Sequence, residues 1–158
     1  WMLKPDDVTA DDLIWYIDGS RRYPHNWELA TTGCGVAVVR TDGTLVGQAW
    51  ATPPSWIKTA ATAEAWTLYL VLQETPFPPL VVTDCLGLLN TAAAGPSAAT
   101  AGSRTNARVW RQVSDILSGQ LHHRTCLFPR YKHVSHPMLY NLEPSDRAAK
   151  LFSQLHIV

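Results

Sequence analysis

The feature that most constrains the fold is the apolar run from Leu13 to Ile17, which is followed directly by Asp18-Gly19-Ser20. β-Branched and aromatic residues dominate this run, a composition typical of a buried strand, and the Gly-Ser pair predicts a turn. We therefore expect Asp18 at the point where a core strand ends. A carboxylate there is unfavourable unless it is hydrogen-bonded, ion-paired or bound to a cation, because burial disfavours the charged form.

The composition indicates one globular domain. The chain has 158 residues, of which 46% are hydrophobic and 16% charged, enough apolar material for one core and too much for a disordered chain. The 13 Lys and Arg residues balance the 13 Asp and Glu residues, so any contact with nucleic acid must be local. No apolar run reaches the ~18 to 20 residues of a membrane span, and we expect no membrane association.

The cysteines and the N-terminus bear on the setting of the chain. Cys34, Cys85 and Cys126 are odd in number, widely spaced and without a C-x-x-C pair, which favours reduced thiols in an intracellular setting, the cytoplasm or nucleus. We expect residues 1–12 to form a polar lead-in and residues 13–158 the domain itself. The chain begins with Trp1 and shows no secretory signal, so we expect it to be part of a longer polypeptide.

Hydrophobic periodicity and turn residues predict three antiparallel strands, a helix, a strand, two helices, a strand and a closing helix. The predicted ranges are Leu13–Ser20, Gly33–Arg40, Leu45–Ala51, Thr59–Gln73, Leu80–Thr83, Cys85–Ala94, Thr105–Ser118, Thr125–Lys132 and Ser145–Leu155. Asp42-Gly43 predicts a hairpin turn. Gly95–Ser103 is expected to be a surface loop, and Gly119 to end a helix. The predicted class is therefore an α/β domain with a mixed sheet.

Four acids recur at the ends of these elements: Asp18, Glu64, Asp84 and Asp146. Asp18 and Asp84 end strands that a helical crossover would place side by side, and ligands bind outside the carboxyl ends of such strands. Glu64 could reach that point from the intervening helix, and Asp146 from the last one. Four carboxylates repel one another unless cations lie among them, and such sites suit Mg²⁺ or Mn²⁺. Two ions of this kind would support phosphodiester cleavage.

These residues resemble the ribonuclease H family over most of the chain, from Leu13 to Lys150. Tyr-Ile-Asp18-Gly-Ser looks like the family's first-strand motif, Thr-Ala-Ala-Thr-Ala-Glu64 like the helix with its catalytic glutamate, and Val-Val-Thr-Asp84 like its fourth-strand aspartate. Near the end, His133-Val-Ser-His136-Pro resembles the family's mobile histidine loop, and Asp146-Arg-Ala-Ala the start of its last helix.

The resemblance implies an RNase H-like mixed five-stranded sheet in the order 3-2-1-4-5, flanked by helices. It also implies a metal-dependent endoribonuclease that hydrolyses the RNA strand of RNA:DNA hybrids with two Mg²⁺ ions, which Mn²⁺ could replace. The expected partners are the hybrid and other domains of a larger polypeptide, such as a retroelement reverse transcriptase polyprotein.

The resemblance further implies residue roles. Asp18 would bridge both metals, Glu64 and Asp84 would hold one, Asp146 the other, and His133 would assist proton transfer or product release. Substrate contacts would come from Gly19 and Ser20 beside Asp18, from Thr59 at a DNA phosphate, and from Arg104. Arg104 and the arginines that follow it have a second interpretation as a solvated helix face.

The chain departs from the family at positions that contact the hybrid. Ala60 and Ala61 stand where many members have asparagines, Leu86 where a polar residue is common, and Gly95–Ser103 replaces a basic helical protrusion of some members. The sequence as a whole leaves two alternatives to the endoribonuclease open. One is a catalytically weak or inert RNase H-fold module that binds nucleic acid or acts as a spacer, and the other is a DNA-cutting relative of the transposase or integrase kind.

Overall fold

The computed structural model describes residues 1–23, 25–127 and 155–158, with side chains omitted for Gln120–Leu127 and His156. Its elements in chain order are β1 (Leu13–Arg22), β2 (Thr31–Arg40), β3 (Leu45–Ala51), α1 (Ala60–Glu74), β4 (Leu80–Val82), α2 (Leu86–Ala93), α3 (Pro96–Ala99), α4 (Ala107–Leu127) and β5 (His156–Ile157). None of the described helices is long and apolar enough to cross a membrane.

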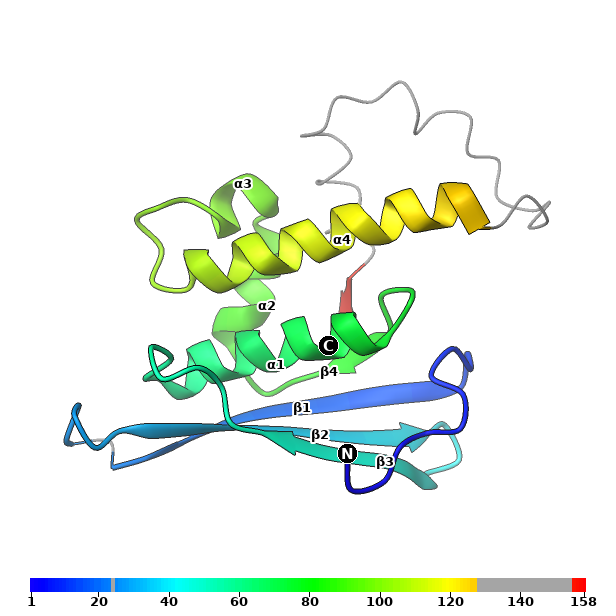
Figure 1. The fold of residues 1–158 in the computed structure, drawn as a ribbon, viewed down its shortest axis with the longest axis horizontal. Helices are drawn as coiled ribbons and strands as arrows, with labels where there is room; N and C mark the ends of the chain where they lie inside the picture. The colour runs from blue at the N-terminus through cyan, green and yellow to red at the C-terminus, as the bar shows by residue number, and fades with distance from the viewer. Residues whose placement is uncertain (24, 128–154) are drawn as a thin grey trace.

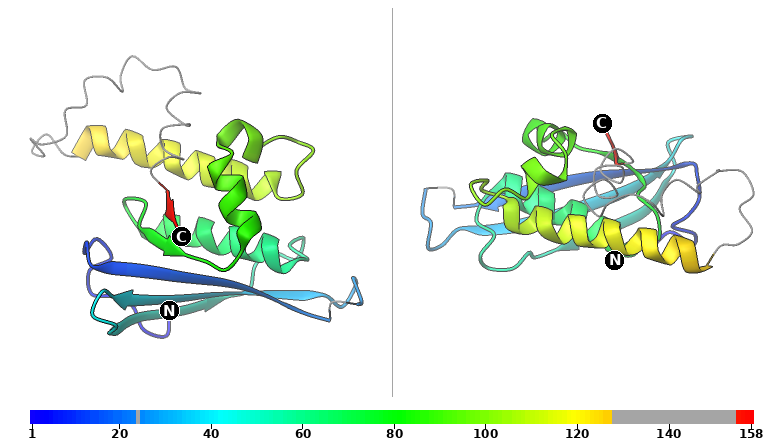
Figure 2. Two further views of the ribbon diagram at one scale, coloured as in Figure 1. Left: turned by 180° about the vertical axis from the view of Figure 1, so that it is seen from behind. Right: turned by 90° about the horizontal axis from the view of Figure 1, so that it is seen from above.

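The strands form one mixed sheet in the order β3-β2-β1-β4-β5. β1, β2 and β3 are antiparallel neighbours, whereas β4 runs parallel to β1 and β5 parallel to β4. Helix α1 lies between the sheet and α4, as Figure 1 and the left view of Figure 2 show. The predicted class, an α/β domain with this strand order, is confirmed, although the fifth strand comes from a different segment than expected.

Local sequence signals explain the first half of the fold. Gly43 has a φ of 90° in the turn between β2 and β3, which confirms the hairpin predicted from Asp42-Gly43. Helix α1 begins after Thr59, whose side chain accepts a hydrogen bond from the Thr62 backbone N–H and so caps the helix. The helix ends at Glu74, two residues before Pro76, which cannot continue a helix.

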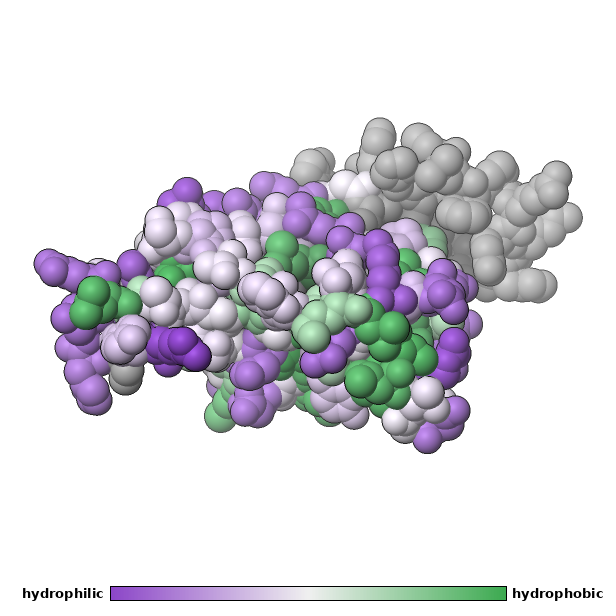
Figure 3. Space-filling model, turned by 60° about the horizontal axis from the view of Figure 1, so that its bottom comes forward, coloured by the Kyte–Doolittle hydropathy of each residue, from purple (hydrophilic) through white to green (hydrophobic). Residues whose placement is uncertain are grey.

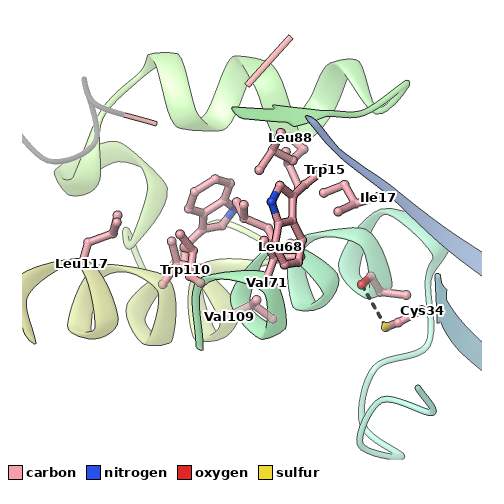
Figure 4. Close-up of a cluster of buried hydrophobic side chains, with 14 of the residues drawn as sticks. Trp15, Ile17, Cys34, Leu68, Val71, Leu88, Val109, Trp110 and Leu117 are labelled. Carbon is pink, nitrogen blue, oxygen red and sulfur yellow. Dashed lines mark hydrogen bonds between the residues drawn. The ribbon is translucent and has the colours of Figure 1, made fainter. Parts of the chain in front are cut away.

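The core lies between the sheet and the two long helices. Trp15 of β1 and Trp110 of α4 are 0% and 1% exposed, and Leu68 of α1 and Leu88 of α2 pack in the same cluster. Figure 4 shows these side chains pointing toward one another from four elements. Burial of these large apolar groups fixes β1, α1, α2 and α4 against one another.

Several predicted boundaries are wrong. β1 continues through Gly19 and Ser20 to Arg22, because both residues pair with β2 instead of forming a turn. Within the predicted loop Gly95–Ser103, residues Pro96–Ala99 form the short helix α3.

The end of α4 is a further correction. The helix passes through Gly119 to Leu127, so it does not end at Gly119, and the start of the predicted strand Thr125–Lys132 is helical. An interior glycine costs a helix only about 1 kcal/mol, which the buried Val113 and Leu117 on the preceding turns can offset. The fifth strand is His156–Ile157. Of the predicted helix Ser145–Leu155, only Leu155 is described, and it lies in neither a helix nor a strand.

The first residues are docked on the domain. Leu3 bridges to Gln48 at the outer edge of β3, Trp1 packs edge-on against Trp15 at 6.0 Å, and Lys4 forms a 3.2 Å ion pair with Glu74. Figure 3, in which the sheet side is turned forward, shows apolar side chains gathered in patches among polar ones. The lead-in is thus less polar in its contacts than its aspartates suggest, since Trp1 and Leu3 lie on the sheet.

Candidate active site

The best-positioned acid is Glu64, in the first half of α1. Its side chain is 4% exposed, and its Oε1 accepts a hydrogen bond from the Thr83 hydroxyl at the end of β4. Helix α1 can approach the sheet closely here because Gly19 lies beneath it. A Cβ at Gly19 would lie 2.5 Å from the Ala60 carbonyl oxygen and 2.5 Å from the Glu64 nitrogen. The glycine therefore helps to bring Glu64 down to the sheet.

Asp18 lies on β1, and Asp84 follows β4, the parallel neighbour of β1. The last aligned pair of the two strands is Tyr16 with Val82, so Asp18 lies two residues beyond that pair within β1, and Asp84 lies two residues beyond it, after the end of β4. Both side chains are exposed. The prediction that Asp18 lies at a strand end is wrong, because Asp18 lies within β1 and pairs with Gly35 of β2.

The charges of these acids act on one another. Burial raises the pKa of Glu64 above its ordinary value of 4.5, the Thr83 hydrogen bond opposes that shift, and the negative charges of Asp84 and Asp18 raise the pKa further. Three acids from β1, α1 and the end of β4 therefore share one electrostatic environment. That these acids bind a metal together stays a prediction.

Relative to wild type, Glu64→Gln should stabilise the metal-free protein more at pH 8 than at pH 4. The raised pKa means that the folded protein binds the Glu64 proton more tightly than the unfolded chain does. The wild-type free energy of unfolding therefore falls as the pH rises from about 4.5 through the folded pKa. Urea denaturation of both proteins in a chelator at the two pH values measures the difference. The same difference at both values would contradict this expectation.

The donor chemistry fits a divalent cation. Carboxylate oxygens are the ligands that Mg²⁺ and Mn²⁺ prefer, and a cation would relieve the repulsion that raises the pKa of Glu64. Within residues 1–23, 25–127 and 155–158, no group of three or more His, Cys, Asp or Glu side chains is placed to hold a metal ion.

A second polar cluster lies at the N-terminus of α1. The hydroxyls of Thr59 and Thr62 are 2.6 Å apart, and the Thr62 hydroxyl donates to Oδ1 of Asn106, the residue before α4, at 2.7 Å. The first backbone N–H groups of a helix favour anions. Thr59, which the resemblance places at a DNA phosphate, is thus part of a small hydroxyl and amide network.

Basic and aromatic side chains flank this cluster. The Arg108 guanidinium lies 4.1 Å from the centre of the Trp56 ring, and Trp56 packs edge-on against Trp66 at 5.8 Å. Arg104 and Arg111 are exposed on the same part of the chain. None of these three arginines forms an ion pair with any residue that the structure describes. Their charges are therefore available to an anionic partner.

The remaining predicted site residues fall into two groups. Gly19 and Ser20 lie in β1, and the structure gives Gly19 a packing requirement under α1, so its contact with a substrate stays a prediction. Asp146 and His133 lie outside the described residues, as does His136. Thr83 and Asn106 were not predicted. The only sequence signal for Thr83 is its place directly before Asp84.

No model of a known protein family and no curated protein matches the chain. Among solved structures, it is similar to RNase H1 from the halophilic archaeon Halobacterium salinarum NRC-1, with a TM-score of 0.51 at 19% identity over 68% of this chain and 77% of that one. The PFV RNase H domain gives 0.53 at 16% identity, over 93% and 96% of the two chains.

A foamy viral protease-reverse transcriptase in complex with RNA/DNA hybrid is also similar, with a TM-score of 0.54 at 17% identity. The match covers 72% of this chain but only 17% of that one. These similarities show that the chain has an RNase H-like fold, which confirms the fold that the resemblance implies.

Proposed function

We propose that this domain is a metal-dependent endoribonuclease that hydrolyses the RNA strand of RNA:DNA hybrids. The observation that carries the proposal is the placement of Asp18 on β1, Glu64 on α1 and Asp84 just after β4 of an RNase H-like fold, where the charges of both aspartates act on Glu64. Asp146 and His133 would complete the site by resemblance. The foamy viral protease-reverse transcriptase that this chain resembles is much longer, since the match covers only 17% of it. This similarity supports a place for the domain within a retroelement reverse transcriptase polyprotein.

The residues fit the parts that this reaction needs. Asp18, Glu64 and Asp84 would hold Mg²⁺, with Asp146 as a further ligand, and bound Mg²⁺ would supply a more acidic water and charge stabilisation at the phosphate. Glu64 is pre-positioned by its burial and by Thr83. The exposed carboxylates of Asp18 and Asp84 remain accessible to a phosphodiester backbone. An imidazole at His133 would titrate near neutrality, which suits proton transfer.

The N-terminal end of α1 supports binding of the nucleic-acid backbone. Thr59 lies at the start of the helix, where backbone N–H groups favour phosphate, and Arg108 lies in the first turn of α4 with Arg104 three residues before that helix. These exposed arginines give this surface a local positive charge, although the formal net charge of the whole chain is zero. We infer that the hybrid crosses this surface between the acids and the start of α4.

Replacing Arg104, Arg108 and Arg111 together by Gln should raise the KM for hybrid and leave kcat nearly unchanged. Each lost phosphate contact should reduce the slope of log affinity against log salt by roughly 0.7 to 0.9. Steady-state kinetics over a salt series measures both effects. Arg40→Gln is the control, because Arg40 lies at the end of β2, opposite Leu13 at the start of β1, and forms an ion pair with Asp12 at 2.6 Å. An unchanged salt slope in the triple variant would contradict these contacts.

A second candidate is an inert RNase H-fold module that binds nucleic acid or acts as a spacer. It is favoured by the described residues, among which no group of three or more His, Cys, Asp or Glu side chains is placed to hold a metal ion. Initial rates on an RNA:DNA hybrid, duplex RNA and duplex DNA, together with hybrid binding, separate the candidates. The endoribonuclease cuts the hybrid in Mg²⁺. The inert module binds hybrid without cutting it, and cleavage of duplex DNA would indicate the transposase-like alternative.

A further inference from the structure

Thr83 links the candidate catalytic acids in a way that their own positions do not require. It is the residue between β4 and Asp84, and its side chain is buried. Its hydroxyl donates to Oε1 of Glu64 and accepts a 3.1 Å hydrogen bond from the Cys85 backbone N–H. Its own N–H donates to the Val158 carbonyl at 2.9 Å, which fixes the backbone at the end of β4.

The direction of these hydrogen bonds matters. A threonine hydroxyl has one proton, and the Cys85 N–H can only donate to its oxygen. The proton of Thr83 is therefore free to point at Glu64, which as a carboxylate can only accept. This hydrogen bond fixes the orientation of the Glu64 side chain beside the end of β4.

We propose that Thr83 is a positioning residue, whose hydroxyl holds the Glu64 carboxylate in the orientation in which it binds a divalent cation together with Asp84. The inference rests on the proposed function. Residues that orient metal ligands by hydrogen bonds typically change metal affinity or activity by roughly 10- to 100-fold when they are removed. Thr83 is well placed for this role, because it directly follows β4 and directly precedes Asp84.

A purely structural role makes a different prediction. The Thr83 hydroxyl also satisfies the Cys85 N–H at the start of α2, and the loss of that hydrogen bond would lower stability without changing cation affinity. Cation binding in the absence of substrate is therefore the informative readout. Isothermal calorimetry with Mn²⁺ on the folded protein measures it, and hybrid cleavage then gives kcat and KM separately.

The test compares Thr83→Val, which removes the hydroxyl at constant shape, with Thr83→Ser, which keeps it. Thr75→Val is the matched control, because its buried hydroxyl binds the Val71 carbonyl at the other end of α1. Thr83→Val should weaken Mn²⁺ binding and lower kcat by roughly 10- to 100-fold with little change in KM. Thr83→Ser should restore both to within about threefold of wild type, and Thr75→Val should leave both unchanged.

Thr83→Ala should show the same loss as the valine variant, so the inference does not depend on the folding of one variant. If wild-type protein binds Mn²⁺ and cuts hybrid, and the alanine and valine variants do so equally well, the role of Thr83 is overturned. The proposed function is not overturned by that result. Failure of Thr83→Ser to restore binding would also overturn the role of Thr83. Wild-type protein that neither binds Mn²⁺ nor cuts hybrid would overturn the proposed function and this inference together.

Discussion

Asp84→Asn should lower Mg²⁺-dependent cleavage of an RNA:DNA hybrid by on the order of a thousandfold or more, about 4 kcal/mol in activation free energy. The amide keeps the size of the side chain but removes a negative charge that acts on Glu64. A neutral oxygen is a much weaker ligand for Mg²⁺ than a carboxylate. Single-turnover rates at saturating hybrid measure the loss without the effect of substrate affinity.

The fold should not change in this variant. Asp84 is exposed, and its charge disfavours the ionised form of Glu64, so its removal should leave the melting temperature equal or slightly higher. Asp115→Asn on the exposed face of α4 is the control and should cleave at the wild-type rate. Undiminished cleavage by Asp84→Asn, with Asp115→Asn also active, would remove Asp84 from the site.

Gly19→Ala should destabilise the protein by about 3 kcal/mol or more, at the upper end of the cost of overpacking. The added Cβ would lie 2.5 Å from two backbone atoms of α1, the Ala60 oxygen and the Glu64 nitrogen. Backbone atoms cannot swing aside as the end of a flexible side chain can. The helix would have to move away from β1, and with it the Glu64 carboxylate. Chemical denaturation with a constant m-value measures the change in stability.

Gly35→Ala is the matched control in the neighbouring strand. The nearest atom to a Cβ at Gly35 is the Asp18 carbonyl oxygen at 4.0 Å, which is ordinary contact. We expect its free energy of unfolding to stay within about 0.5 kcal/mol of wild type. If Gly19→Ala were as stable as Gly35→Ala, the close approach of α1 to β1 would be wrong.

The sequence predicts elements whose signals are local. Asp42-Gly43 forms a turn, and Thr59 caps the helix that follows it. β3 lies between that turn and Pro53-Pro54. Their ends could therefore be predicted to within a residue. The turn predicted at Gly19-Ser20 is wrong, because Gly19 is a common turn residue but in the structure it pairs with β2 and lies against α1, whose Glu64 is 45 residues further along the chain.

Long-range contacts explain the other errors. Gly119 lies inside α4 because packing on its preceding turns outweighs its low helix propensity, and β5 joins the sheet by pairing with β4. The three described acids of the candidate site could be named from the sequence, since each is close to the end of a recognisable element or on one face of a helix, but their role as metal ligands stays a prediction. Thr83 could not be predicted, because its hydrogen-bond partner Glu64 is 19 residues away and side-chain hydroxyls carry no pattern.

The most direct test of the account is cleavage of an RNA:DNA hybrid in which each strand is end-labelled in turn, with Mg²⁺ and with a chelator. The account predicts internal cuts in the RNA strand alone, present in Mg²⁺ and absent in the chelator. Hybrid that is bound but left intact in both Mg²⁺ and Mn²⁺, or cuts that persist in the chelator, would contradict it.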